Sequence, residues 1–223
     1  AGSGPVLDGR TIARHPFDPD GPPQAAQVPL LIGCNRTEGT SLTSADSPNH
    51  SLTWETLPAA LATAFPRTDS QAIIDLYRTN HPSIEAPELY FMATSDNTFF
   101  RGSVTVADRQ SAQGAPVYFY MLDWVTPVMG GKRYVPHALD IGMAFDNVAK
   151  SESMSGTGPD AQRIADQMSE SWLAFARKGD PNNPNVPAWP AYTSDQRNMM
   201  VFRDQPGVEV DIRSAERALT APA

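Results

Sequence analysis

The 223-residue sequence predicts an α/β protein with a mainly parallel sheet and helical insertions. Three short apolar runs, at 28–34, 116–122 and 199–202, have the length and composition of buried strands. Helical patterns at 51–110 and 159–178 lie between them. This alternation is typical of parallel sheets, because each connection must cross a face of the sheet before the next parallel strand begins.

The first apolar run, VPLLIGC at 28–34, follows a segment rich in Pro, Gly and Asp and is bounded by Asn35. A run of this length with no alternating polar positions is typical of a strand in a parallel sheet, where helices cover both faces. We therefore expect a strand that is buried on both faces.

Three helices are expected in the first helical region. Pro58 suits a first helical turn, and Asp69 or Ser70 can cap the second helix through a side-chain oxygen. Pro87 can open the third helix, which is expected to end near Gly114.

The second strand is predicted at 116–122, where the sequence PVYFYML is rich in β-branched and aromatic residues. A long and mostly irregular stretch is expected at 123–158, and loops of this length in compact domains are often functional. The helix at 159–178 has the clearest signals, since Pro159 stands at its start and Gly179 directly after its end.

Composition excludes several classes of function. The net charge of -8 and the pI near 4.9 argue against nucleic acid as a partner, because an acidic surface repels phosphates. No apolar run reaches the ~20 residues needed to cross a bilayer, so no membrane span is expected. The single cysteine, Cys34, lies in a predicted strand and is expected to be a packed, unreactive thiol.

The sequence contains no zinc motif of the H-E-x-x-H type, no Cys/His ligand spacing, no G-x-G-x-x-G and no P-loop, and therefore predicts no cofactor. The nucleophile signature G-x-S-x-G and a Gly-rich oxyanion segment are also absent.

Glu38 and His137 are the candidate catalytic residues. Each follows a predicted buried strand, and the carboxyl ends of parallel strands are where α/β sheets build their sites. A carboxylate bonded to the second ring nitrogen would orient a histidine base. On position alone, two simpler interpretations remain open. His137 could be an ordinary loop histidine, and Glu38 could be an exposed loop acid paired with Arg36. Solvent-facing or structural roles are expected for the other histidines, His15, His50 and His81.

Several segments, in order along the chain, resemble those of a known family. They are GPVLDG at 4–9, VPLLIGCNRTEGT at 28–40, QGAPVYFYMLDW at 113–124, VPHALDIGMAF at 135–145, WLAFARKGDPN at 172–182 and WPAY at 189–192. The chain resembles the C-terminal half of type-B carboxylesterases, which include para-nitrobenzyl esterases and cholinesterases. Thr37 departs from the Asp usual before the acid, and Cys34 from the more common Thr or Val, but the Glu and the following Gly are retained.

The resemblance implies that residues 1–223 form the C-terminal part of an α/β-hydrolase catalytic domain. It implies a Ser-His-Glu triad that hydrolyses carboxylic esters, with Glu38 as the acid and His137 as the base. The serine and the oxyanion hole would lie in an N-terminal half that is absent from this chain. The expected partners are therefore a small-molecule ester and that missing half.

Two other hypotheses remain open. Some members of the family are non-catalytic binding or adhesion domains, although those usually lose a triad residue, whereas both visible positions are retained here. A self-contained α/β binding protein would instead fold cooperatively as a monomer. A fragment of an esterase would expose an apolar sheet edge and aggregate, or associate tightly with the missing half.

Overall fold

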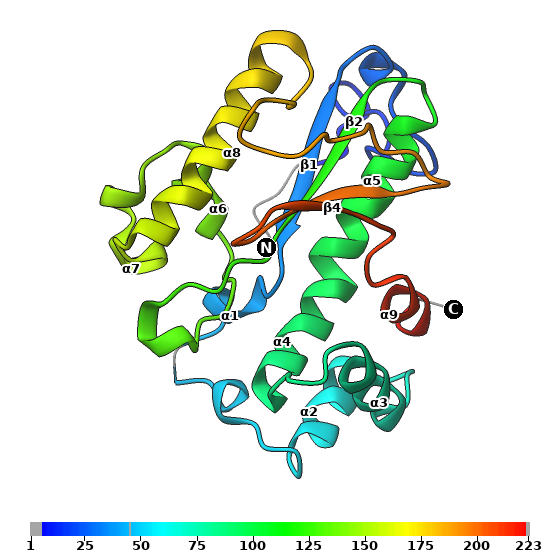
Figure 1. Cartoon of the computed structure of the whole chain (residues 1–223). Helices are drawn as coiled ribbons and strands as arrows, with labels where there is room; N and C mark the ends of the chain where they lie inside the picture. Colours follow the sequence, from blue (N-terminus) through cyan, green and yellow to red (C-terminus); the bar gives the residue numbers. More distant parts are fainter. Residues whose placement is uncertain (1–5, 45, 222–223) are drawn as a thin grey trace.

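The computed structural model describes residues 6–44 and 46–221, so Gly4 and Pro5 of the GPVLDG segment lie outside the described residues. The described residues form one four-stranded sheet in the order β1-β2-β3-β4 (Figure 1). The first three strands are parallel and β4 is antiparallel to β3. The strands are β1 (Leu30–Asn35), β2 (Val117–Leu122), β3 (Asn198–Phe202) and β4 (Gly207–Val210). The predicted fold class, α/β with a mainly parallel sheet, is confirmed.

The first helical region contains α2 (Leu57–Ala64), α3 (Ser70–Asn80), α4 (Ala86–Ser95) and α5 (Arg101–Ser111). The Asp69 side chain accepts a hydrogen bond from the Gln71 N–H at 3.1 Å, as expected of an N-cap. The third predicted helix is divided into α4 and α5 by a π-helical turn, η3 (Asp96–Phe100). A π turn inserts an extra residue and re-aims the side chains around it.

The second half of the chain contains α8 (Pro159–Lys178), which ends at Gly179 in the left-handed conformation (φ 72°). The predicted irregular stretch at 123–158 is more structured than expected, since it holds several short helices. These are η4 (Val128–Gly131), α6 (Leu139–Ala144), η5 (Val148–Lys150) and α7 (Glu152–Ser155). The remaining short helices are η1 (Pro23–Ala25), α1 (Gly39–Leu42), η2 (Pro48–Ser51) and α9 (Ser214–Leu219).

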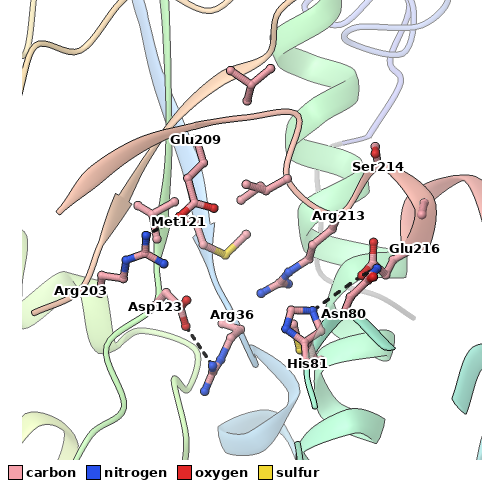
Figure 2. Close-up of a pocket in the computed structure, with 15 residues that line it drawn as sticks. Arg36, Asn80, His81, Met121, Asp123, Arg203, Glu209, Arg213, Ser214 and Glu216 are labelled. Atoms are coloured by element: carbon pink, nitrogen blue, oxygen red, sulfur yellow. Dashed lines mark hydrogen bonds and ion pairs between the residues drawn. The ribbon is translucent and has the colours of Figure 1, made fainter. Parts of the chain in front are cut away.

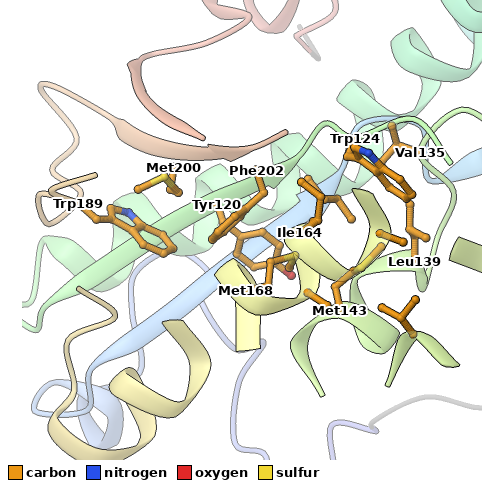
Figure 3. Close-up of a cluster of buried hydrophobic side chains, with 14 of the residues drawn as sticks. Tyr120, Trp124, Val135, Leu139, Met143, Ile164, Met168, Trp189, Met200 and Phe202 are labelled. Atoms are coloured by element: carbon orange, nitrogen blue, oxygen red, sulfur yellow. The ribbon is translucent and has the colours of Figure 1, made fainter. Parts of the chain in front are cut away.

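Strand β2 is the centre of the core, and all six of its residues are buried. On one face, Tyr118, Tyr120 and Leu122 belong to a cluster that includes side chains of α6 and α8 (Figure 3). On the other face, Val117, Phe119 and Met121 pack in a cluster with side chains of α5. A third cluster joins α2, α3 and α4 below the sheet in Figure 1.

Strand β1 is less buried than its apolar sequence predicts. Leu30, Leu31 and Ile32 are only half-buried, and burial is complete only at Cys34 and Asn35. The reason is that β1 pairs with β2 on one edge and has no strand on the other edge among the described residues. An apolar strand with an open edge is a surface suited to pairing with a further strand.

Candidate active site

The fold brings Glu38 and His137 into direct contact, although they are 99 positions apart. Glu38 Oε2 lies 2.6 Å from His137 Nδ1. Glu38 follows the carboxyl end of β1 and forms the N-cap of α1, and His137 lies in the turn that leads into α6. The parallel register pairs Asn35 with Leu122, so β1 and β2 end at the same level and their following loops meet.

Backbone hydrogen bonds join these two loops. Thr37 N–H donates to the Val135 carbonyl at 3.1 Å, and Val135 N–H donates to Thr37 Oγ1 at 2.8 Å. His137 N–H donates to the Glu38 carbonyl at 3.3 Å. The Ser41 hydroxyl donates to the His137 carbonyl at 3.1 Å, so it is bound to the backbone of the histidine. Thr37, where the resemblance leads one to expect Asp, therefore binds the histidine segment directly.

The Glu38 carboxylate is nearly enclosed, with a side-chain exposure of 5%. Burial raises its pKa above the ordinary value of 4.5, and hydrogen bonds from Asn35 and His137 oppose this shift. The Asn35 N–H donates to Oε1 at 2.7 Å, which leaves Oε2 for the histidine. Each carboxylate oxygen thus has its own donor.

The His137 side chain is far more accessible, with an exposure of 45%. Its ring lies against Phe99 of η3, with ring centroids 5.4 Å apart. With Nδ1 bound to Glu38, Nε2 is left without a hydrogen-bond partner among the residues that the structure describes. A histidine held in this way can accept a proton at Nε2 while the carboxylate stabilises the imidazolium.

The other histidines lie in ordinary surroundings. His50 Nε2 is 3.2 Å from Thr43 Oγ1, and His81 Nε2 is 3.7 Å from a carboxylate oxygen of Glu216. His15 is exposed. These positions agree with the structural or solvent-facing roles expected from the sequence.

Arg36 does not pair with Glu38, which was the simple alternative for that acid. Its guanidinium instead reaches Glu88 of α4 at 2.5 Å. It also reaches Asp123, which directly follows β2, at 3.0 Å (Figure 2). Cys34 is buried and free, and burial raises the pKa of its thiol, so it remains protonated. It is therefore a packing residue.

A cavity of about 530 Å³ lies beside Arg36, between the ends of β2 and β3 and helix α9 (Figure 2). Charged residues of both signs line it, including Asp123, Arg213 and Glu216, but neither Glu38 nor His137 does. Within residues 6–44 and 46–221, no group of three or more His, Cys, Asp or Glu side chains could hold a metal ion. In the same part of the chain, no helix combines the length and hydropathy of a membrane span.

A family model described as the carboxylesterase family matches residues 1–219. The chain belongs to the carboxylesterase family. The para-nitrobenzyl esterase of Bacillus subtilis (strain 168) is 30% identical over 221 residues, an alignment that covers 98% of this chain and 43% of that protein. The phenmedipham hydrolase of Pseudarthrobacter oxydans is 26% identical over 211 residues, covering 92% of this chain and 41% of the relative.

Solved carboxylesterase structures contain the same fold. A carboxylesterase of Geobacillus stearothermophilus, crystallised at pH 6.8, superposes with a TM-score of 0.75 at 32% identity and covers 98% of this chain. A para-nitrobenzyl esterase structure gives a TM-score of 0.70 at 26% identity. The chain spans 44% and 43% of these two structures, so this carboxylesterase chain corresponds to less than half of each.

Proposed function

We propose that this carboxylesterase chain supplies the acid and the base of a Ser-His-Glu triad that hydrolyses carboxylic esters. Glu38 is the acid and His137 is the base. The observation that carries the proposal is the 2.6 Å contact between Glu38 Oε2 and His137 Nδ1. Membership of the carboxylesterase family supports the same reaction class.

The arrangement suits the roles of a triad. A serine outside this chain attacks the ester carbonyl, and its proton passes to Nε2 of His137. The buried Glu38 carboxylate stabilises the resulting imidazolium through Nδ1. His137 then returns the proton to the leaving alcohol, and a water molecule activated by the same histidine releases the acid. Donors outside this chain stabilise the oxyanion.

We further propose that residues 1–223 are the C-terminal part of the catalytic domain, completed by an N-terminal part that carries the serine. The 223-residue sequence contains no G-x-S-x-G, and it spans only 43% of the para-nitrobenzyl esterase it matches. The open edge of β1 supports this proposal. Beside it, Ile32, Phe99 and Val106 line a shallow apolar hollow of about 380 Å³, which a further layer of the domain would cover.

The test uses the complete polypeptide that carries these residues, with p-nitrophenyl acetate as substrate and a fluorophosphonate as the probe of an activated serine. We expect His137→Ala to lower kcat by about 10³-fold or more and to abolish labelling, because the base is lost. The matched control is His15→Ala, which alters an exposed histidine and should leave both unchanged.

Retention of near-normal kcat by His137→Ala would refute the assignment of the base. A complete polypeptide with no labelled serine and no hydrolysis in the unaltered form would instead indicate a non-catalytic binding domain of the same family.

A further inference from the structure

Asn35, the last residue of β1, contacts both members of the candidate pair. Its backbone N–H donates to Glu38 Oε1 at 2.7 Å. Its side-chain amide donates to the carbonyl of Pro136, next to the histidine, at 2.8 Å and to Asp140 Oδ1 at 3.1 Å. Asn35 is 1% exposed, so water does not replace these bonds. One buried residue therefore holds the acid by its backbone and the histidine segment by its side chain.

Asp140 connects this amide to the centre of the sheet. Its second oxygen, Oδ2, accepts a hydrogen bond from the Tyr120 hydroxyl at 2.8 Å. Tyr120 lies on β2, and its ring packs edge-on against Trp172 of α8 with centroids 4.9 Å apart. Burial, followed by the nearby Asp140 charge, raises the pKa of Tyr120, so its hydroxyl remains protonated and can donate.

The orientation of the Asn35 amide is fixed by what surrounds it. Its two N–H groups point at two acceptors, and its Oδ1 has no partner among residues 6–44 and 46–221. Rotating the amide by half a turn would set Oδ1 against the Pro136 carbonyl and the Asp140 carboxylate, both of which are acceptors. The amide can therefore hold the histidine segment in only one way, and this depends on Asp140 staying in place.

We propose that Tyr120, Asp140 and Asn35 form a positioning chain that aligns the Glu38–His137 pair. The inference rests on the proposed function, since alignment matters only if the pair acts in a reaction. None of the three touches the reacting atoms: Tyr120 fixes Asp140, Asp140 fixes the Asn35 amide, and Asn35 fixes both partners. Hydrogen bonds to a charged carboxylate are stronger than neutral ones, which suits a rigid support.

Tyr120→Phe is the sharpest test because it removes one hydroxyl and leaves the ring in place. The matched control is Tyr118→Phe. Tyr118 lies on the same face of the same strand, both tyrosines are 8% exposed, and the Tyr118 ring packs on Trp189. The Tyr118 hydroxyl makes no hydrogen bond to the described residues.

In the complete polypeptide we expect Tyr120→Phe to lower kcat by about 10-fold with KM unchanged, since the loss affects alignment in the transition state. Asn35→Asp should lower kcat by about 100-fold, because it places an acceptor where two donors are needed. Tyr118→Phe should change neither constant by more than about twofold.

A second measurement does not depend on activity. In protein labelled with ¹⁵N-histidine, the proton shared by His137 Nδ1 and Glu38 gives a downfield NMR resonance. We expect this resonance to move upfield or broaden in Tyr120→Phe and to stay in place in Tyr118→Phe. Equal effects of the two tyrosine variants on kcat and on this resonance would overturn the positioning proposal.

The two hypotheses fail in different ways. If the unaltered polypeptide neither hydrolyses p-nitrophenyl acetate nor reacts with the fluorophosphonate, the proposed function fails. The NMR comparison of the two tyrosine variants still decides whether the chain from Tyr120 to Asn35 orients the pair.

Discussion

The substitution Glu38→Gln isolates the charge of the proposed acid, because it keeps the size of the side chain. The surroundings determine how the new amide must lie. The Asn35 N–H, 2.7 Å from Oε1, is a fixed backbone donor and requires an acceptor. The amide oxygen therefore faces Asn35, and its NH₂ group faces His137 Nδ1. This makes Nδ1 an acceptor and moves the ring proton to Nε2, where it blocks the uptake of a proton from the serine.

The expected fall in kcat can be worked out from the cost of the opposite orientation of the new amide. Turning the amide around would leave the buried Asn35 N–H unpaired, at a cost of about 1–3 kcal/mol. The productive tautomer is then reduced by about 5- to 150-fold, at about 1.4 kcal/mol for each factor of ten. Loss of the carboxylate beside the imidazolium lowers the rate further. We expect kcat to fall by about 10³- to 10⁴-fold, the size of effect known for the equivalent change in serine protease triads.

The assay is steady-state hydrolysis of p-nitrophenyl acetate by the complete polypeptide, together with thermal unfolding from pH 4 to pH 8. Because burial raises the pKa of Glu38 in the folded state, the folded state binds this proton more tightly than the unfolded state does. The acid's contribution to stability is fully present below its ordinary pKa of 4.5 and is lost as the pH rises through the folded pKa. The Gln side chain does not ionise, so the variant does not lose stability in this way. The Tm of the variant minus the Tm of the unaltered protein should therefore increase with pH.

Two results would refute this reasoning. If Glu38→Gln retains kcat within about tenfold, the contact between Nδ1 and Oε2 does not set the tautomer of the base. If its relative Tm falls as the pH rises, the carboxylate is stabilised by its surroundings, contrary to the direction assigned to its pKa.

Two further predictions concern stability and are measured by urea unfolding. Gly33→Ala should destabilise the chain by about 3 kcal/mol or prevent folding, because a Cβ would lie 2.1 Å from the Tyr120 carbonyl oxygen of the neighbouring strand; a midpoint like that of the unaltered chain would contradict this. Arg213→Met should lower the free energy of unfolding by about 3–5 kcal/mol, because it leaves the buried Asp96 carboxylate without its cationic partner. The side chains of Arg213 and Asp96 are only 8% and 1% exposed. The control is Arg203→Met, which removes the exposed ion pair with Glu209 (44% and 40% exposed) and should cost less than about 1 kcal/mol. Equal losses of stability in the two arginine variants would show that burial does not decide the effect.

The elements that the sequence predicted well are those whose pattern is decided locally. The run at 116–122 is continuous and apolar because both faces of β2 are covered, and all six strand residues are buried. The start of α3 was indicated by Asp69, whose cap requires only its own neighbours. Such features need no knowledge of the rest of the fold.

The elements that the sequence did not predict depend on distant contacts. Strand β4 has four residues, half or fully exposed, and exists because it pairs with β3. Helices α6 and α9 have six residues each, too short to be stable without packing. A pattern of hydrophobicity over four to six residues cannot distinguish these segments from loops.

The candidate site likewise has a part that the sequence predicts and a part that depends on distant contacts. Glu38 and His137 could be selected because each follows a predicted strand, but nothing local to either residue indicates that they touch. Their contact depends on the register between β1 and β2, which sets Asn35 opposite Leu122. The link from Asn35 to Asp140 and Tyr120 joins three segments, β1, α6 and β2. The only local signal for it is that the polar Asn35 ends an apolar strand, and this signal does not indicate which residues Asn35 contacts.

Several independent contacts within this chain fix the geometry of the Glu38–His137 pair. The two loops share backbone hydrogen bonds, Asn35 holds both, and the chain turns sharply after His137 because Ala138 adopts a left-handed conformation (φ 69°). Such a conformation is unfavourable for a residue with a Cβ, so it persists only where surrounding contacts enforce it. We infer that the pair is preorganised by these loops. In the proposed triad, the segment that carries the nucleophile would then have to bring its hydroxyl to Nε2 and would not need to assemble the acid and base.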